Sequence, residues 1–339
     1  MARPKPRHRK TENAPRRPRG EACEKPRAAP PPEPSQTPRP PRRKGARLPE
    51  RVGVMLEREA SDDFELLDTG DGRKLERYGT LTLDRPEAQA LWRPAMREWK
   101  ADATFTGDID EEGAGRWQFA SERTETWPLA WEGVAYHGRF TAFRHVGVFP
   151  EQAPHWALMR DLIATRETPR VLNLFGYTGV ASLVAARAGA EVTHVDASKK
   201  AIGWARENAR LADLEDAPIR WICDDAVRFA EREVRRERTY DVLLIDPPAF
   251  GRGPKGETWR FFEDVPHLLD LARQLQSDHP LMTVVTSYAI RASHLAVHEL
   301  MQDRFAGMSG RLESGEAILR DRAGRALSTS MFTRFLGEA

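Results

Sequence analysis

Two short segments of the chain combine residue types that can bind one small molecule and hold a second beside it. Residues 171–179 are an apolar run that ends in Phe-Gly-Tyr-Thr-Gly, and residues 246–250 read Asp-Pro-Pro-Ala-Phe after another apolar run. Glycines let a backbone approach a ligand closely, whereas prolines fix the chain and remove N–H donors. We therefore expect a cofactor at the first segment and an acceptor molecule at the second.

The first segment is predicted to turn from a strand into a helix at residues 176–179. The N-terminus of a helix presents free N–H groups to an anion, so the methionine carboxylate of S-adenosylmethionine or a pyrophosphate would suit it. NAD is the rival cofactor, but residues 176–181 read Gly-Tyr-Thr-Gly-Val-Ala and lack the Gly-x-Gly-x-x-Gly fingerprint. The turn therefore favours S-adenosylmethionine without excluding NAD.

Acidic residues end the next two predicted strands. Asp196 follows Gly179 by 17 residues, a spacing typical of an acid that binds ribose hydroxyls. Asp224 and Asp225 follow the third strand, where a carboxylate can accept a hydrogen bond from the adenine amine. Asp225 is alternatively the N-cap of the following helix, and both interpretations stay open.

The second segment is a corner that offers hydrogen-bond acceptors. The Asp246 side chain and the carbonyl of Pro247 can hold a planar amine or ring edge in line with a methyl donor, which requires positioning rather than acid chemistry. Phe250 either stacks on a base or anchors the loop. Residues 251–260 read as a mobile basic loop that either clamps a phosphate or is solvated.

From residue 170 onward, strands and helices alternate, which predicts a mostly parallel sheet covered by helices on both faces. We expect an α/β, Rossmann-like, seven-stranded sheet that ends in an antiparallel hairpin. A helix over 153–165 precedes it. The predicted strands are 171–175, 191–196, 219–223, 240–245, 281–286, 311–319 and 326–335.

Residues 49–150 predict a small β-rich domain on the substrate side. Residues 68–72 and His137-Gly138 are the expected turns of two hairpins. Aromatic side chains of this region either build a core or stack on a substrate base. Six of the nine tryptophans lie in residues 92–156: Trp92, Trp99, Trp117, Trp127, Trp131 and Trp156.

Residues 1–48 differ in composition from the rest of the chain. They hold 15 Lys/Arg against 4 Asp/Glu and 12 of the 25 prolines, whereas the remainder holds 38 Lys/Arg against 47 Asp/Glu. We interpret them as a disordered basic tail that either contacts nucleic acid or is a solvated extension, with translation alternatively starting at Met55. We divide the rest of the chain into two predicted domains, residues 49–150 and residues 151–339, and the second is the cofactor-binding domain.

The chain has two cysteines, Cys23 and Cys223, so we expect no disulfide framework, no metal site and a cytoplasmic protein. No apolar run reaches 18 residues, so no membrane partner is expected. The oligomeric state is left open.

The chain resembles class I S-adenosylmethionine-dependent methyltransferases, and within them the group that modifies large-subunit ribosomal RNA. The resemblance covers about residues 145–339 and rests on 147–152, 173–179, 195–198, 224–226 and 246–250. It implies S-adenosylmethionine as the cofactor and RNA as the partner. The implied cofactor-binding residues are Asn173, Phe175, Gly176, Tyr177, Thr178, Gly179, Asp196, Ala197, Asp224, Asp225 and Asp246, and the implied catalytic residues are Asp246, Pro247 and Phe250.

Two departures from the group refine this expectation. Phe175 and Tyr177 stand where glycines are usual, and residues 286–290 read Thr-Ser-Tyr-Ala-Ile, where cytosine-C5 members carry a nucleophilic cysteine. A pyrimidine carbon needs such a thiolate, whereas a nitrogen attacks with its own lone pair. We therefore expect methylation of a base nitrogen in ribosomal RNA. A protein side chain or small metabolite as substrate, favoured by the acidic remainder, is the alternative, and a non-catalytic RNA-binding module is a third.

Overall fold

The computed structural model describes residues 45–107, 115–122, 125–288 and 290–338, which belong to one compact unit. Most of the expected tail, 1–48, lies outside the described residues. Its last residues do not fit a disordered tail, because Leu48 is buried and its backbone N–H donates to Gln302 Oε1 at 2.9 Å. Among the described residues, every helix is too short or too polar to span a membrane.

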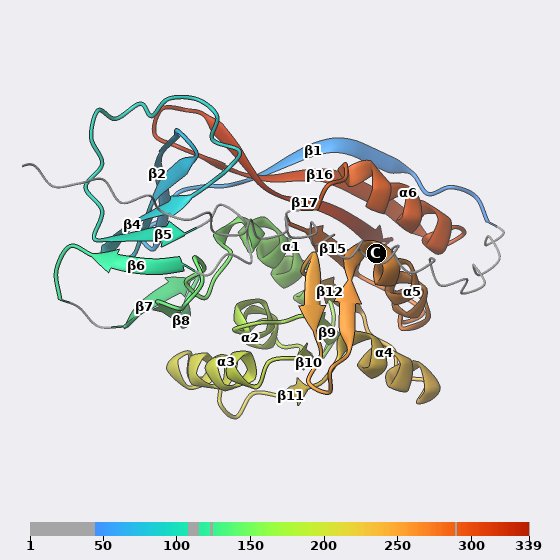
Figure 1. Ribbon diagram of the computed structural model, residues 1–339. Helices are drawn as coiled ribbons and strands as arrows, with labels where there is room; N and C mark the ends of the chain where they lie inside the picture. Colours follow the sequence, from blue (N-terminus) through green and yellow to red (C-terminus); the bar gives the residue numbers. More distant parts are fainter. Residues whose placement is uncertain (1–44, 108–114, 123–124, 289, 339) are drawn as a thin grey trace, which may run out of the picture. The chain divides into compact units, whose positions relative to one another are not determined.

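A large sheet of eight strands forms the centre of the fold (Figure 1). Five of the strands (β9, β10, β11, β12 and β15) run parallel, and β17 lies antiparallel between β15 and β16. In spatial order the strands are β1 (Glu50–Arg58), β16 (Gly310–Arg320), β17 (Ala326–Gly337), β15 (Met282–Ser287), β12 (Val242–Ile245), β9 (Arg170–Leu174), β10 (Glu191–Asp196) and β11 (Ile219–Cys223).

The edge strand β1 corrects two predictions. The large sheet has eight strands instead of seven, and β1 belongs to this sheet although residues 49–150 were assigned to the small β-rich domain. It pairs in parallel with β16, from Glu50 opposite Leu312 to Arg58 opposite Leu319. A methyl group on Gly315 would collide with the Val54 carbonyl, so the glycine allows the two backbones to approach. Because most β1 side chains are exposed, the strand lacks the apolar pattern that would reveal its pairing.

Helices cover both faces of the large sheet, as expected for an α/β fold. Neighbouring strand residues point to opposite faces, so Val171 and Leu244 join one core while Leu172 and Leu243 join the other. The first core is covered by α1 (Ala153–Ile163), which follows a short 3-10 turn η1 (Pro150–Gln152), and by α2 (Val180–Arg187) and α3 (Lys199–Leu211). The second core is covered by α4 (Ala226–Arg235), α5 (Phe261–Gln274) and α6 (His294–Phe305).

Residues 64–139 form two further β-sheets, in agreement with the predicted β-rich region. The larger has five strands in the order β2 (Phe64–Gly70), β3 (Arg73–Tyr78), β4 (Leu81–Pro86), β5 (Ala103–Gly107) and β6 (Gly115–Phe119). The smaller pairs β7 (Thr126–Trp131) with β8 (Val134–Arg139). The β2–β3 turn lies at Asp71-Gly72, within the predicted segment 68–72.

The predicted turn at His137-Gly138 is wrong, because these residues lie inside β8. The chain turns at Glu132 and Gly133, with φ of 44° and 82°, the left-handed pair that a tight hairpin needs. Gly138 instead lies against the Trp127 ring, which a methyl group would strike. The glycine thus serves packing rather than the turn.

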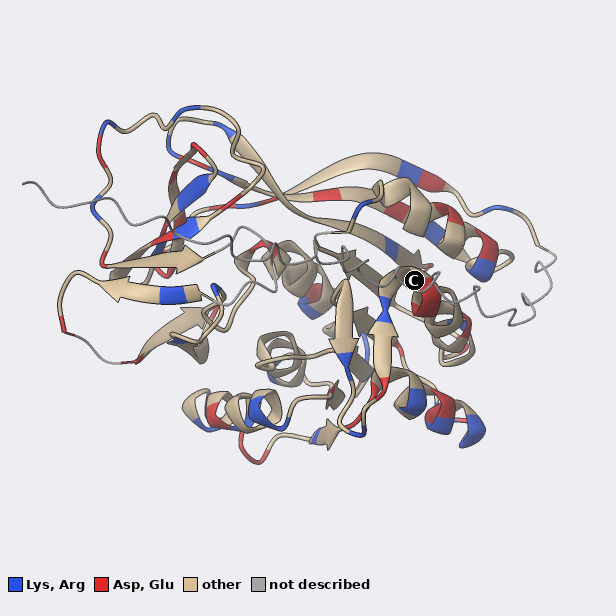
Figure 2. Ribbon diagram, in the orientation of Figure 1, with Lys and Arg blue, Asp and Glu red and all other residues tan. Residues whose placement is uncertain are grey.

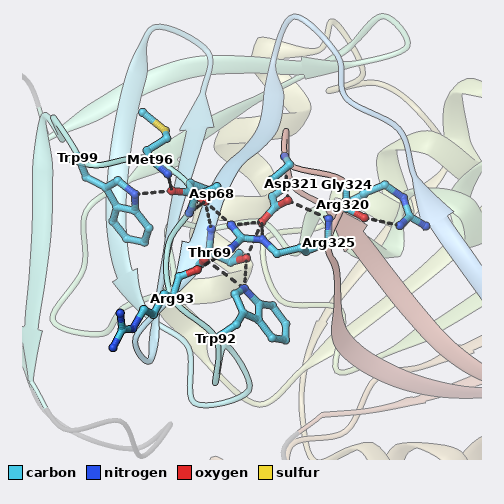
Figure 3. A network of polar contacts seen from close by, with 12 residues as sticks. Asp68, Thr69, Trp92, Arg93, Met96, Trp99, Arg320, Asp321, Gly324 and Arg325 are labelled. Carbon is cyan, nitrogen blue, oxygen red and sulfur yellow. Dashed lines mark hydrogen bonds and ion pairs between the residues drawn. The ribbon is translucent and has the colours of Figure 1, made fainter.

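A buried polar network ties the five-stranded sheet to the turn of the β16–β17 hairpin (Figure 3). Asp68 accepts a hydrogen bond from Trp99 Nε1 at 2.8 Å and pairs with Arg325. Arg325 Nε also donates to Asp321 at 2.8 Å, and Thr69 Oγ1 donates to Asp321 at 2.6 Å. The network fixes the five-stranded sheet against the β16–β17 hairpin of the eight-stranded sheet.

Candidate active site

A pocket opens at the carboxyl ends of β9, β12 and β15, the position at which open α/β sheets bind ligands. Its walls come from the turn after β9, the end of β12 and the segment that precedes η1. Asn173, Phe175, Gly176, Tyr177, Thr178 and Asp246 all line it. The structure therefore brings the turn after β9 and Asp246 of the second segment to one cavity, whereas Pro247 and Phe250 are not among its lining residues.

The turn after β9 keeps a glycine-like backbone without the usual glycines. Phe175 and Tyr177 have φ of 59° and 51°, values that cost side-chain-bearing residues energy. Gly176 is confined on its other side, because a methyl group there would strike the His194 ring. Such strain persists where surrounding contacts over-determine it, and it is common at ligand sites.

Buried hydrogen bonds hold this turn in place. Asn173 Nδ2 donates to Ser182 Oγ at 2.9 Å, so this side chain fixes the start of α2. Thr178 Oγ1 donates to the Gly147 carbonyl at 2.6 Å, and its own carbonyl accepts from Asn208 Nδ2 at 2.9 Å. Asn173 and Thr178 thus line the pocket while their hydrogen-bonding groups shape its wall.

Asp196 lies at the end of β10, next to the turn rather than in the pocket lining. Its two carboxylate oxygens accept the backbone N–H groups of Tyr177 at 2.9 Å and Ser198 at 2.7 Å. Burial raises the pKa of Asp196, while these two hydrogen bonds oppose the rise. Each oxygen keeps a second lone pair, so the carboxylate can still accept hydroxyl groups. Ala197 follows, with its carbonyl 3.6 Å from Cys223 Sγ.

The two acids after β11 have partners of their own. Asp225 caps α4, accepting the Arg228 N–H at 3.0 Å, so the capping alternative is realised. Burial raises the pKa of Asp225, against the hydrogen bond from Arg228. Asp224 pairs with Arg232. Neither acid lines the pocket at β9 and β12.

The acceptor corner is built on the end of β12. Asp246 accepts a hydrogen bond from the Thr286 hydroxyl of β15. Burial raises the pKa of Asp246, and the Thr286 hydrogen bond only partly offsets this. Pro247 is buried, while the Pro248 carbonyl accepts from Trp259 Nε1 at 2.7 Å.

A short hairpin, rather than the predicted mobile loop, follows this corner. β13 (Phe250–Arg252) pairs with β14 (Thr258–Arg260), and Trp259 is buried with its ring centroid 5.0 Å from that of Phe175. Phe250 is 40% exposed, so it is not a buried anchor. Sequence reasoning missed Trp259, whose exposed–buried–exposed neighbourhood spans only three residues.

Two aromatic or imidazole side chains of α1, His155 and Trp156, also line the pocket. The helix was predicted from the sequence, but no ligand role was predicted for His155. For Trp156 the prediction was only that it builds a core or stacks on a substrate base, as for the other tryptophans of residues 92–156. Phe149, from the segment before η1, lies with its ring centroid 5.8 Å from that of Tyr177. Aromatic rings therefore form part of the pocket walls, beside aliphatic side chains such as Val180 and Leu244 and polar ones such as Asn173 and Asp246.

Comparison with known proteins identifies the family. The model for S-adenosylmethionine-dependent methyltransferases matches residues 107–298, more than half of the chain, and the chain belongs to this family. A crystal structure of the SAM-dependent methyltransferase from Agrobacterium tumefaciens is 55% identical, covering 88% of this chain and 97% of that one, with a TM-score of 0.85. These findings confirm the expected α/β fold, enzyme class and cofactor.

Two more distant proteins are also similar. Ribosomal RNA large subunit methyltransferase K/L of Syntrophotalea carbinolica is 30% identical over 149 residues, which are 44% of this chain and 20% of that protein. The match thus spans about one fifth of the relative's length. A putative methyltransferase complexed with SAH is 17% identical over 81% of this chain and 76% of that one, with a TM-score of 0.63, which indicates a shared fold.

Proposed function

We propose that this methyltransferase acts on a nitrogen of a ribosomal RNA base. The observation that carries the proposal is the acceptor corner, where Asp246 accepts a hydrogen bond from Thr286 and where, among the described residues, no cysteine lines the pocket. Among the described residues the free cysteine is Cys223, at the end of β11 and bonded to Ala197. A carbon target would need a thiolate nucleophile, so a nitrogen target fits the corner better.

The pocket residues fit the cofactor of the family. The start of α2, with Val180 and Ala181 in the lining, offers backbone N–H groups to a carboxylate. Asp196 keeps lone pairs for the ribose hydroxyls, and Asp224 or Asp225 lies one strand further along, toward the adenine side. S-adenosylmethionine, when bound, supplies a methyl group on a sulfonium.

In this proposal the chain's own residues act by positioning. The Asp246 carboxylate and the Pro247 carbonyl accept hydrogen bonds from an amine or ring edge, which turns the nitrogen lone pair toward the methyl group. Phe250 stacks on the face of the base, since its ring is exposed beside the corner. Ordering of the two reactants can lower the barrier by several kcal/mol, on the order of 7–11 for ideal alignment.

The β13–β14 hairpin supplies a basic surface for an RNA backbone. Figure 2 shows Lys and Arg along this hairpin, where Arg252 and Lys255 are exposed. Such side chains neutralise phosphates without reading sequence. The ribosomal RNA relative supports an RNA substrate for the matched region, and we expect the enzyme to act in the cytoplasm.

Mapping of ribosomal RNA methylation tests the substrate. A strain that lacks the gene is compared with its parent and with a strain complemented by the wild-type gene. We expect one nitrogen-methylated base to disappear and to return on complementation. Unchanged maps would rule out ribosomal RNA and favour a protein side chain or small metabolite as the substrate.

The hairpin is tested by a charge-removing double variant. Replacing Arg252 and Lys255 with alanine is expected to weaken RNA binding across all sequences and to lower the slope of log K against log salt by about one per lost phosphate contact. The matched control replaces Arg51 and Arg210, which are exposed arginines outside the hairpin. An equal loss in both double variants would contradict a specific role for the hairpin.

A further inference from the structure

An aromatic cluster on the surface of the β-rich region leaves two phenylalanine rings half exposed. Phe119 of β6 is 48% exposed, and Phe143, in the loop between β8 and η1, is 52% exposed. Phe140 packs against both Phe119 and Trp117, with ring centroids 4.9 Å apart in each pair. Because Trp117 and Phe140 are half-buried, the rings most open to a partner are those of Phe119 and Phe143.

The backbone of Phe143 is held in place while its ring remains exposed. Its carbonyl accepts a hydrogen bond from Trp117 Nε1 at 3.2 Å, and its N–H donates to Thr141 Oγ1 at 3.1 Å. The first of these bonds also ties the loop to β6, which carries Phe119. An exposed ring on a fixed backbone loses little conformational freedom when a planar ligand stacks on it.

The loop that carries Phe143 leads directly to the cofactor pocket. Gly147 and Phe149 line this pocket. Gly147 follows Phe143 by four residues, so their Cα atoms lie at most about 14 Å apart. The ring centroids of His145 and Phe149 are 4.9 Å apart, and those of Phe149 and Tyr177 are 5.8 Å apart. Aromatic side chains thus continue from the cofactor turn toward the surface of the β-rich region.

The exposed aromatic area suits single bases and is too small for a second protein chain. A phenylalanine side chain has a surface of about 200 Å², so two half-exposed rings together offer about 200 Å². A stable protein–protein interface buries about 800 Å² on each partner. In contrast, one ring is enough to stack one base, and unpaired RNA bases bind to exposed aromatic side chains in this way.

We propose that Phe119 and Phe143 stack on unpaired bases of the RNA that flank the target nucleotide. The target base lies at Asp246, and the RNA strand continues past Phe149 to the aromatic cluster. Such binding depends on RNA as the substrate, as in the proposed function. The β13–β14 hairpin then contacts phosphates, whereas the cluster contacts bases and holds the strand on the other side of the target.

Fluorescence anisotropy of a short single-stranded oligouridylate, titrated with the full chain, tests the stacking. In Phe143→Ala we expect about 5- to 100-fold weaker binding, the loss typical of one stacked base. The slope of log K against log salt should stay at the wild-type value, because no phosphate contact is removed. Phe143→Leu keeps an apolar side chain without a ring and should lose as much, whereas Phe143→Tyr should stay within about twofold of wild type.

Two further variants complete the test. Phe119→Ala should weaken binding with the same unchanged salt slope. Leu295→Ala is the matched control, because it removes an exposed apolar side chain of α6, 46% exposed, and should leave the affinity unchanged. Wild-type affinity in both alanine variants of the cluster, or an equal loss in Leu295→Ala, would overturn the role of the cluster. So would a wild-type protein that does not bind the oligouridylate, whereas the methylation map decides the proposed function separately.

Discussion

At the scale of single residues, surroundings set what each carboxylate can do. Burial raises the pKa of Asp246, and the Thr286 hydroxyl is the hydrogen-bond donor that favours its charged form. In the proposed function, the ionised carboxylate would hold the amine that accepts the methyl group. The balance between burial and the Thr286 hydroxyl would then set the lowest pH at which Asp246 can do so.

Removing that hydroxyl should move the acid limb of the pH–rate profile. In Thr286→Val the hydrogen bond to Asp246 is lost, so its pKa rises further and the carboxylate ionises only at higher pH. We expect the acid limb of kcat/KM to shift to higher pH. The measurement is the pH dependence of methyl transfer, with Thr333→Val as the control, since Thr333 is a buried threonine of β17 whose hydroxyl has no partner among the described residues. An unmoved limb would refute the role of Asp246.

The sequence revealed residues whose role depends on near neighbours and missed those whose role depends on distant ones. Asp225 caps α4, one of its two predicted roles, and accepts the Arg228 N–H at 3.0 Å, because capping depends on residues only three positions apart. Trp259 and His155 could not be recognised, since their importance comes from contacts with Phe175 and Phe332, which are distant in the chain.

At the scale of elements, the turn between β9 and α2 combines a strained backbone with tight packing. Gly179 is the N-cap of α2 with φ of 83°, and a methyl group on it would lie 2.9 Å from the Ala205 Cβ. Both facts demand glycine at this position. The strand and helix on either side were predictable from apolar periodicity, whereas the left-handed Phe175 and Tyr177 contradict local preference.

A pair of glycine substitutions tests this turn. Gly179→Ala should destabilise the fold by more than about 1 kcal/mol, because both its φ and its packing oppose a methyl group. Gly203→Ala lies in α3 with open space around the new methyl group and should stabilise by up to about 1 kcal/mol. Urea unfolding of the two variants measures both changes, and equal signs would contradict this account of the turn.

At the scale of the whole molecule, a few contacts between distant segments fix the five-stranded sheet to the β16–β17 hairpin of the eight-stranded sheet. Asp68 is the centre of these contacts (Figure 3). Burial acts to raise its pKa, but hydrogen bonds from Met96 and Trp99 outweigh it, and the pKa lies below the ordinary value. Its stabilising contribution is therefore complete above the unfolded pKa, near 3.8, and is lost as the pH falls through the folded pKa.

Removing this carboxylate should cost far more than removing an exposed pair nearby. Asp68→Ala removes one of the two carboxylates that pair with Arg325 and takes away the acceptor of Trp99 Nε1. It is expected to destabilise by about 3 kcal/mol, with less sensitivity to acid than the wild type. Arg320→Ala breaks an exposed ion pair with Glu57 and should cost less than about 1 kcal/mol. Thermal unfolding at pH 7 and at about pH 2.5, below the unfolded pKa of an aspartate, compares them, and similar losses at pH 7 would contradict the importance of the buried network.

Strand β1 has a consequence for the order of events during synthesis. Its Glu57 meets Arg320 of β16, 263 residues further along the chain. At a translation rate of about 5–20 residues per second, the strand waits about 13–50 s before its partner leaves the ribosome. During that interval its backbone groups are unpaired, and the charged, glycine-interrupted sequence of β1 (Glu-Arg-Val-Gly-Val-Met-Leu-Glu-Arg) suits a segment that must avoid premature association.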